Sequence, residues 1–144
     1  MKLPEPFVYF VDRSLGGQIV VEALRAAGET AHAHDDHFEQ STPDADWLVE
    51  VGRRRWVVLT KDKDIRRNRL EHVALVRANV ACFMLGRGDL KASRMGEIFV
   101  SALPRMRRIL RRYEVALAAS VSAGGTMRVL LADGQWLDPP RDVK

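Results

Sequence analysis

The chain has 144 residues, 47% of them hydrophobic, and a formal net charge of +4. This length and apolar content suffice for one globular domain over residues 1–144 with a buried core, and they exclude an intrinsically disordered chain. A single cysteine excludes an internal disulfide, and the absence of a signal-peptide core or of an apolar run near the roughly 18 residues of a membrane span leads us to expect a cytoplasmic protein without a membrane partner.

The first elements read as a strand, a short loop and a helix. Five apolar residues, 7–11, run directly into Asp12, and residues 12–17 form a loop. A helix is expected over 15–27, closed by Gly28. Its apolar stripe comprises Ile19, Val20, Ala23, Leu24 and Ala27.

The next segment predicts a weak strand over 30–34 and a polar loop over 35–40. Ser41 to Asp44 has the spacing of a capping box with Pro in the first turn, so a helix should begin there. It should run to about residue 52–54, with Trp47, Leu48 and Val51 as its apolar face.

Two further apolar runs predict buried parallel strands. The run 56–59 contains adjacent valines and ends in Thr60, Lys61, Asp62, Lys63 and Asp64. A short helix is expected within 65–75, and the run 80–85, which contains Cys82, predicts another strand ended by two glycines. In open α/β sheets, ligands bind outside the carboxyl ends of such strands.

The longest helix is expected over 91–113, because apolar residues recur there at three-and-four spacing. Pro104 should bend it. This helix could pack wholly into the core, or leave a groove for a partner or a second copy in a homodimer. Alternating residues around Gly124 and Gly125 then predict a hairpin over 114–137. The order of elements predicts a three-layer α/β/α sandwich with a mainly parallel sheet and a C-terminal β-hairpin.

Arginine supplies 18 of the 23 basic residues. Its planar fork suits phosphate and carboxylate, which indicates an anionic partner, although a preference for arginine codons is an alternative. The arginines gather in three groups: residues 53–55; Arg66, Arg67 and Arg69; and Arg105, Arg107, Arg108, Arg111 and Arg112. For a single arginine, a solvated face is the simpler interpretation.

Five acids could converge on one cavity at the strand ends. They are Asp12, Asp62 and Asp64 after strands, with Asp44 and Asp46 at a helix start. Clustered carboxylates repel unless a cation neutralises them, and Mg²⁺ or Mn²⁺ prefers such oxygen ligands. A metal there could activate water and clamp a phosphodiester, with arginines holding the polyanion.

Three of these acids also have a structural interpretation. Asp44 could complete the cap with Ser41, Asp46 could lie on a solvated face, and Asp64 could cap the next helix. Asp12 follows five apolar residues and needs buried partners if its strand is central. A second candidate metal site, His32, His34 and His37 with Asp35 and Asp36, matches no strict zinc pattern and is more typical of a surface loop.

Three segments together resemble the PIN-like nuclease domains, in particular the small VapC-type toxins. The segments are residues 8–16, with a strand, Asp12 and a loop into a helix; the helix start at 42–48; and residues 56–65. The resemblance covers about the first 90 residues. It departs from the family in lacking an acid directly after the strand 80–85.

The resemblance implies a PIN-like fold and an Mg²⁺- or Mn²⁺-dependent endoribonuclease, commonly a toxin restrained by a cognate antitoxin. Asp12, Asp62 and Asp64 would hold the metal, with Asp44 or Asp46 as the acid on the helix, and arginines such as Arg13, Arg66 and Arg67 would contact RNA. The main alternative is a non-catalytic nucleic-acid- or protein-binding module on the same scaffold. A receiver-like phosphoacceptor domain fits less well, because receivers usually pair acids at the end of the first strand.

Overall fold

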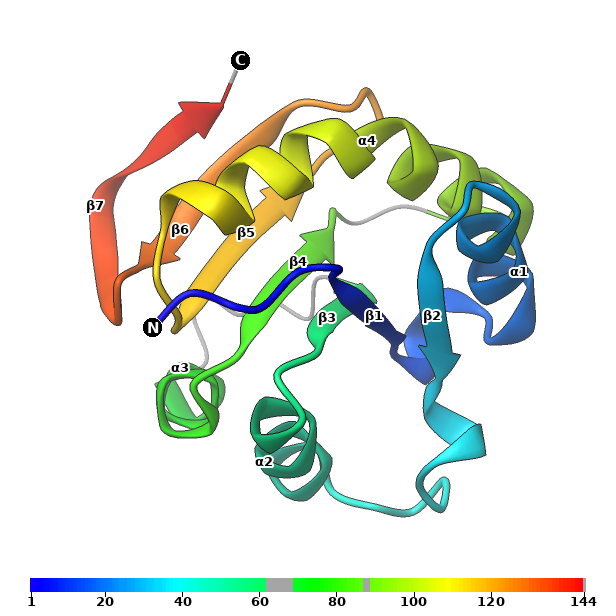
Figure 1. The fold of residues 1–144 in the computed structure, drawn as a ribbon, viewed down its shortest axis with the longest axis horizontal. Helices are drawn as coiled ribbons and strands as arrows, with labels where there is room; N and C mark the ends of the chain where they lie inside the picture. Colours follow the sequence, from blue (N-terminus) through cyan, green and yellow to red (C-terminus); the bar gives the residue numbers. More distant parts are fainter. Residues whose placement is uncertain (62–68, 87–88, 144) are drawn as a thin grey trace.

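The computed structural model describes residues 1–61, 69–86 and 89–143, in which strands and helices alternate (Figure 1). The strands are β1 (Val8–Val11), β2 (Thr30–Ala33), β3 (Val57–Lys61), β4 (Ala81–Leu85), β5 (Leu117–Val121), β6 (Met127–Ala132) and β7 (Gln135–Val143). The helices are α1 (Gln18–Ala26), α2 (Asp44–Arg53), α3 (Arg69–Ala78) and α4 (Ala92–Arg112), with short 3-10 turns at Arg13–Leu15 and His34–Asp36.

The described strands form a seven-stranded sheet in the order β2-β1-β3-β4-β5-β6-β7. β1 to β5 pair in parallel, whereas β6 and β7 are antiparallel additions at one edge. β1 lies between β2 and β3, with Val11 beside both Ala33 and Leu59. The two predicted strand ends, after β1 and after β3, are therefore neighbours in space. The mainly parallel sheet and the C-terminal hairpin are confirmed.

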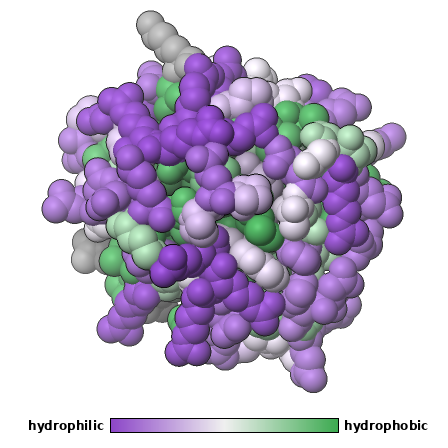
Figure 2. Space-filling model, viewed as in Figure 1, coloured by the Kyte–Doolittle hydropathy of each residue, from purple (hydrophilic) through white to green (hydrophobic). Residues whose placement is uncertain are grey.

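Helices cover both faces of the sheet, so the predicted three-layer sandwich is confirmed (Figure 1). Successive residues of β1 alternate between two buried clusters: Tyr9 and Val11 pack with α1 and α4, and Phe10 packs with α2 and α3. This is the period-two pattern expected of a strand buried on both faces. The surface in Figure 2 is mostly hydrophilic, with apolar residues scattered over it.

Small residues allow the helices of each layer to approach closely. A Cβ atom on Gly52 of α2 would lie 2.0 Å from the carbonyl oxygen of Ala78 at the end of α3. On the opposite face, a Cβ atom on Gly96 of α4 would lie 3.0 Å from the Cβ of Ala23 in α1. The first contact leaves no room for any side chain at position 52.

The predicted start of α1 is wrong. Leu15 ends a 3-10 turn, and the helix begins only at Gln18, after Gly16 and Gly17 with φ of 79° and 67°. The two glycines change the direction of the chain, and Ile19, predicted to lie in the apolar stripe, is 51% exposed. Val20, Val21 and Leu24 are the buried residues of α1.

The capping box predicted at Ser41 to Asp44 is also wrong. Pro43 occupies the cap position of α2 in an extended conformation, and the cap makes no side-chain hydrogen bond. The rest of the helix is as predicted, with Trp47, Leu48 and Val51 buried.

The long helix α4 is continuous through Pro104. Every residue of its predicted apolar stripe, from Met95 to Tyr113, is buried, so the stripe packs into the core rather than forming an open groove. No helix in the described ranges combines the length and the apolar character needed to cross a membrane.

Candidate functional site

Asp12 directly follows β1 and is buried, with 4% of its surface exposed. Its backbone N–H donates a hydrogen bond of 2.9 Å to the carbonyl oxygen of Leu59 in β3. The backbone that carries this carboxyl group is therefore anchored where the ends of two adjacent parallel strands meet. This is the edge of the sheet at which α/β proteins bind ligands.

Two hydroxyl groups hold the Asp12 carboxylate. Thr60 Oγ1 donates to Asp12 Oδ2 at 2.7 Å, and Ser14 Oγ donates to the same oxygen at 2.9 Å. Each hydroxyl has one hydrogen, so the 3.3 Å between the two hydroxyl oxygens is a contact rather than a third hydrogen bond. The backbone N–H of Lys61 donates to Ser14 Oγ at 3.1 Å. Hydrogen bonds of this kind offset the cost of burying a charge and fix its orientation.

Sequence reasoning missed both hydroxyl residues. The sequence places Ser14 in a loop and Thr60 at the end of an apolar run, and neither position by itself indicates a partner for Asp12. The signal that could have found them is positional, because both lie within three residues of strand ends that parallel pairing brings together. We call the group of Asp12, Ser14 and Thr60 the acidic edge.

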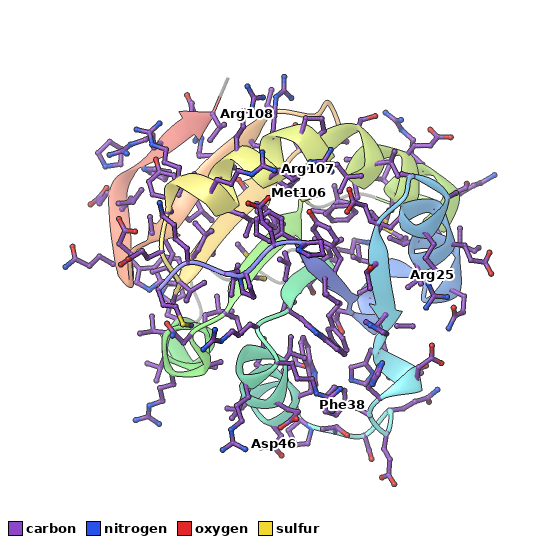
Figure 3. All side chains as sticks on the ribbon, viewed as in Figure 1. Arg25, Phe38, Asp46, Met106, Arg107 and Arg108 are labelled. Carbon is purple, nitrogen blue, oxygen red and sulfur yellow. The ribbon has the colours of Figure 1, made fainter. Side chains whose placement is uncertain are left out.

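The other predicted acids are only partly described. Asp44 Oδ1 accepts a hydrogen bond of 3.0 Å from Trp47 Nε1, and Asp46 is exposed at the outer side of α2 (Figure 3). Asp62 and Asp64 lie outside the described residues. Among the residues that are described, no group of three or more His, Cys, Asp or Glu side chains could hold a metal ion. The five-acid metal site therefore stays a prediction.

Arg13, predicted to contact RNA, is held by an acid. Its Nε lies 3.1 Å from Asp35 Oδ1, and the same carboxylate lies 3.0 Å from His34 Nδ1. The hydrogen bond with His34, followed by the charge of Arg13, lowers the pKa of Asp35 below its usual range. The other two predicted RNA contacts, Arg66 and Arg67, lie outside the described residues.

The histidines separate into two environments. His34 is buried beside Phe10, whereas His32 stacks on Trp56 with ring centroids 4.5 Å apart and an interplanar angle of 8°. His37 Nε2 lies 3.2 Å from His32 Nδ1. Burial, and then the neighbouring His37, lowers the pKa of His32. In the described part of the chain these side chains form an aromatic cluster without the three ligands of a metal site.

Comparison with known proteins places the matched region around the acidic edge. A family model described as "PIN like domain" matches residues 7–87. The chain is also similar to "Putative ribonuclease VapC45" of Mycobacterium tuberculosis (strain ATCC 25618 / H37Rv), with 30% identity over 106 residues that cover 71% of this chain and 77% of that protein. No solved structure matches the chain. The family match includes β1 to β4 and ends before α4.

Proposed function

Because the chain belongs to the PIN-like domain family, we propose that it is a divalent-metal-dependent endoribonuclease. The observation that carries the proposal is the buried Asp12 carboxylate, oriented by Thr60 and Ser14 at the carboxyl ends of two adjacent strands. Burial of a charge is costly, so a fixed carboxylate at a ligand-binding edge is typical of a site rather than of a fold-stabilising residue. The similarity to a protein named as a ribonuclease supports the same reaction.

The donor set at this edge suits a hard cation. The described side chains at this edge present oxygen atoms, the carboxylate of Asp12 and the two hydroxyls that orient it, and carboxylate oxygen is a ligand that Mg²⁺ and Mn²⁺ prefer. Asp12 would hold the metal together with Asp62 and Asp64, the acids that follow β3 in the sequence. Asp44 or Asp46 would add the acid from α2. A bound metal would supply an activated water and a clamp for the phosphodiester.

The remaining residues would position Asp12 or bind the RNA. Thr60 and Ser14 hold the Asp12 carboxylate in one orientation, and the Lys61 backbone N–H holds Ser14 in turn. Arg13, with Arg66 and Arg67, would contact phosphates of the RNA close to the scissile bond.

The biological role that fits this family is that of a toxin. We infer that the protein acts on RNA in the cytoplasm and is restrained by a cognate antitoxin protein. The support is the similarity to a VapC protein and the resemblance of the segments around Asp12 and Thr60 to VapC-type toxins.

The proposal is tested by RNA cleavage with Asp12→Asn. Loss of a metal ligand should lower the cleavage rate at least about 100-fold in Mg²⁺ or Mn²⁺. Loss of a residue that only hydrogen-bonds to a ligand usually has a smaller effect. Asp138→Asn, the same change at an exposed aspartate on β7, should leave the rate unchanged. EDTA should stop cleavage by the wild type.

Two outcomes would contradict the proposal. Cleavage that is unchanged in Asp12→Asn would remove Asp12 from the reaction. RNA binding that survives EDTA, with no cleavage in either metal, would select the non-catalytic binding module instead.

A further inference from the structure

A pocket of about 420 Å³ lies between the last turns of α4 and the end of β7. We call it the arginine pocket. It is lined by Arg108, Ile109, Arg112, Tyr113, Arg141, Asp142 and Val143. All of these residues lie outside the segment 7–87 that the family model matches. Figure 2 shows strongly hydrophilic surface around the end of β7.

Three arginines from two elements line this pocket, and two of them contact its tyrosine. Tyr113 is buried, and its hydroxyl oxygen accepts a hydrogen bond of 2.9 Å from Arg141 of β7. The guanidinium carbons of Arg112 and Arg141 lie 5.3 and 5.9 Å from the centre of the Tyr113 ring, within the range of cation–π contacts. Arg108, one turn before Arg112, is exposed on the outer side of α4 (Figure 3).

These arginines differ from their neighbours in their ion pairing. Arg107 is paired with Glu29, and Arg111 is paired with Glu5 at 2.7 Å. In the described ranges, Arg108, Arg112 and Arg141 form no ion pair with a carboxylate. The acid that lines the pocket, Asp142, is bound to Arg128 at 2.8 Å. The pocket therefore carries positive charge that the described side chains do not neutralise.

General features of helices account for only part of this arrangement. The dipole of α4 favours cations at its carboxyl end, which explains an arginine at position 111 or 112. It does not explain Arg141, which comes from a strand, and Arg108 and Arg112 repel each other at a spacing of four residues. An anion in the pocket would relieve that repulsion.

The β7 side of the pocket lies along the same edge of the sheet as the acidic edge. The strand register runs from Lys61 through Leu85, Val121 and Met127 to Val143, each beside the next. Lys61 contacts Ser14 of the acidic edge, and Val143 lines the pocket. Four strand spacings separate β3 from β7, which corresponds to roughly 19 Å.

From this geometry we propose that the arginine pocket binds backbone phosphates of the RNA substrate at a distance from the bond that is cleaved. The proposal rests on the proposed ribonuclease function. Guanidinium forks match phosphate oxygens two at a time, and exposed arginines contact phosphates without reading the base sequence. The pocket would strengthen the binding of RNA long enough to reach it and would leave the chemical step unchanged.

The test measures RNA binding in the Asp12→Asn background, so that cleavage cannot interfere. A fluorescein-labelled single-stranded RNA of mixed sequence is titrated by fluorescence anisotropy at several salt concentrations. Arg108→Ala/Arg112→Ala should weaken binding about tenfold and reduce the slope of log affinity against log salt by about 1.4, the value for two lost phosphate contacts. Arg141→Ala, a variant of a different element, should reduce the slope by about 0.7.

The matched control is Arg53→Ala/Arg111→Ala, which removes two exposed arginines that are paired with Glu50 and Glu5. Equal affinity and equal salt slope in the control and in the pocket variants would overturn the proposal. The same variants are also titrated with labelled poly-L-glutamate. Pocket variants that bind RNA normally but lose binding of poly-L-glutamate would also overturn the proposal, because the pocket would then bind an acidic protein. Pocket-dependent RNA binding in a protein that cleaves no RNA would support this inference and contradict the proposed catalytic function.

Discussion

The acidic edge and the β7 side of the arginine pocket lie along the same edge of one sheet, but the two sites are built in opposite ways. At the acidic edge a single carboxylate is buried and held by two hydroxyl groups. In the pocket three arginines are exposed, and two of them contact a buried tyrosine. The first lies inside the segment matched by the PIN-like family model, and the second lies wholly outside it.

The difference follows from what each charge has to do. A group that takes part in a reaction must be held in one orientation, and burial with hydrogen-bond partners achieves this. A group that attracts a polyanion acts over a distance and gains from exposure and mobility. Under the two proposals, the part of the fold that the family model matches would carry the reaction, and the C-terminal part of this chain would contribute substrate binding.

After the losses expected from the Asp12 and pocket variants, the largest change in activity is expected from Thr60→Val. This substitution removes a hydrogen-bond donor to Asp12 and keeps the volume of the side chain. Loss of an orienting partner of a metal ligand should lower metal affinity or kcat by about 10–100-fold. The KM for RNA should stay unchanged, the opposite of what the pocket variants produce. Steady-state kinetics at several metal concentrations measure both values.

Thr30→Val is the control for this variant, because Thr30 is an exposed threonine on the edge strand β2. It should behave as the wild type. A Thr60→Val enzyme with normal kcat and a raised KM would contradict the account, because Thr60 would then act in substrate binding, as the pocket arginines are proposed to do.

The smallest effect is expected from Asp35→Asn, which releases Arg13 at the acidic edge. Arg13 would then resemble the arginines of the pocket, and the affinity for RNA should rise by at most about fivefold, the equivalent of one exposed ion pair. A fall in affinity would show that Asp35 positions Arg13 for RNA instead of competing with it. Anisotropy titrations with the same labelled RNA measure the change.

The same variant has a pH-dependent effect on stability. The pKa of Asp35 is lowered in the folded protein, so its contribution is present above the unfolded pKa, about 4, and is lost as the pH falls through the folded value. Asp35→Asn should therefore lower the free energy of unfolding slightly, by at most about 1 kcal/mol, at pH 7. Denaturant titrations at pH 7 and below pH 3 should show the difference shrinking at the lower pH.

The layers of the fold could be predicted from the sequence because the strands of the parallel core are continuous apolar runs. Such runs predict burial on both faces, and Val57 to Leu59 and Ala81 to Leu85 are buried as expected. Errors occurred where the backbone departs from regular geometry. Gly16 and Gly17 delay the start of α1 and turn Ile19 outward, and the extended Pro43 prevents the predicted cap.

The site was predictable only in part. Asp12 stands out in the sequence because an acid after five apolar residues needs buried partners, and the structure provides them. The identity of those partners depends on which strands are neighbours, which periodicity does not reveal. The arginine pocket was equally hidden, since Arg141 reaches Tyr113 from a strand 28 residues further along the chain.

Calorimetric titration of Mn²⁺ tests the central claim most directly, with wild type, Asp12→Asn and Asp138→Asn as the three samples. The account predicts that the wild type and Asp138→Asn bind the metal with the same affinity and that Asp12→Asn binds it at least about 100-fold more weakly. Equal binding in all three proteins, or no binding in the wild type, would contradict a metal centre at Asp12.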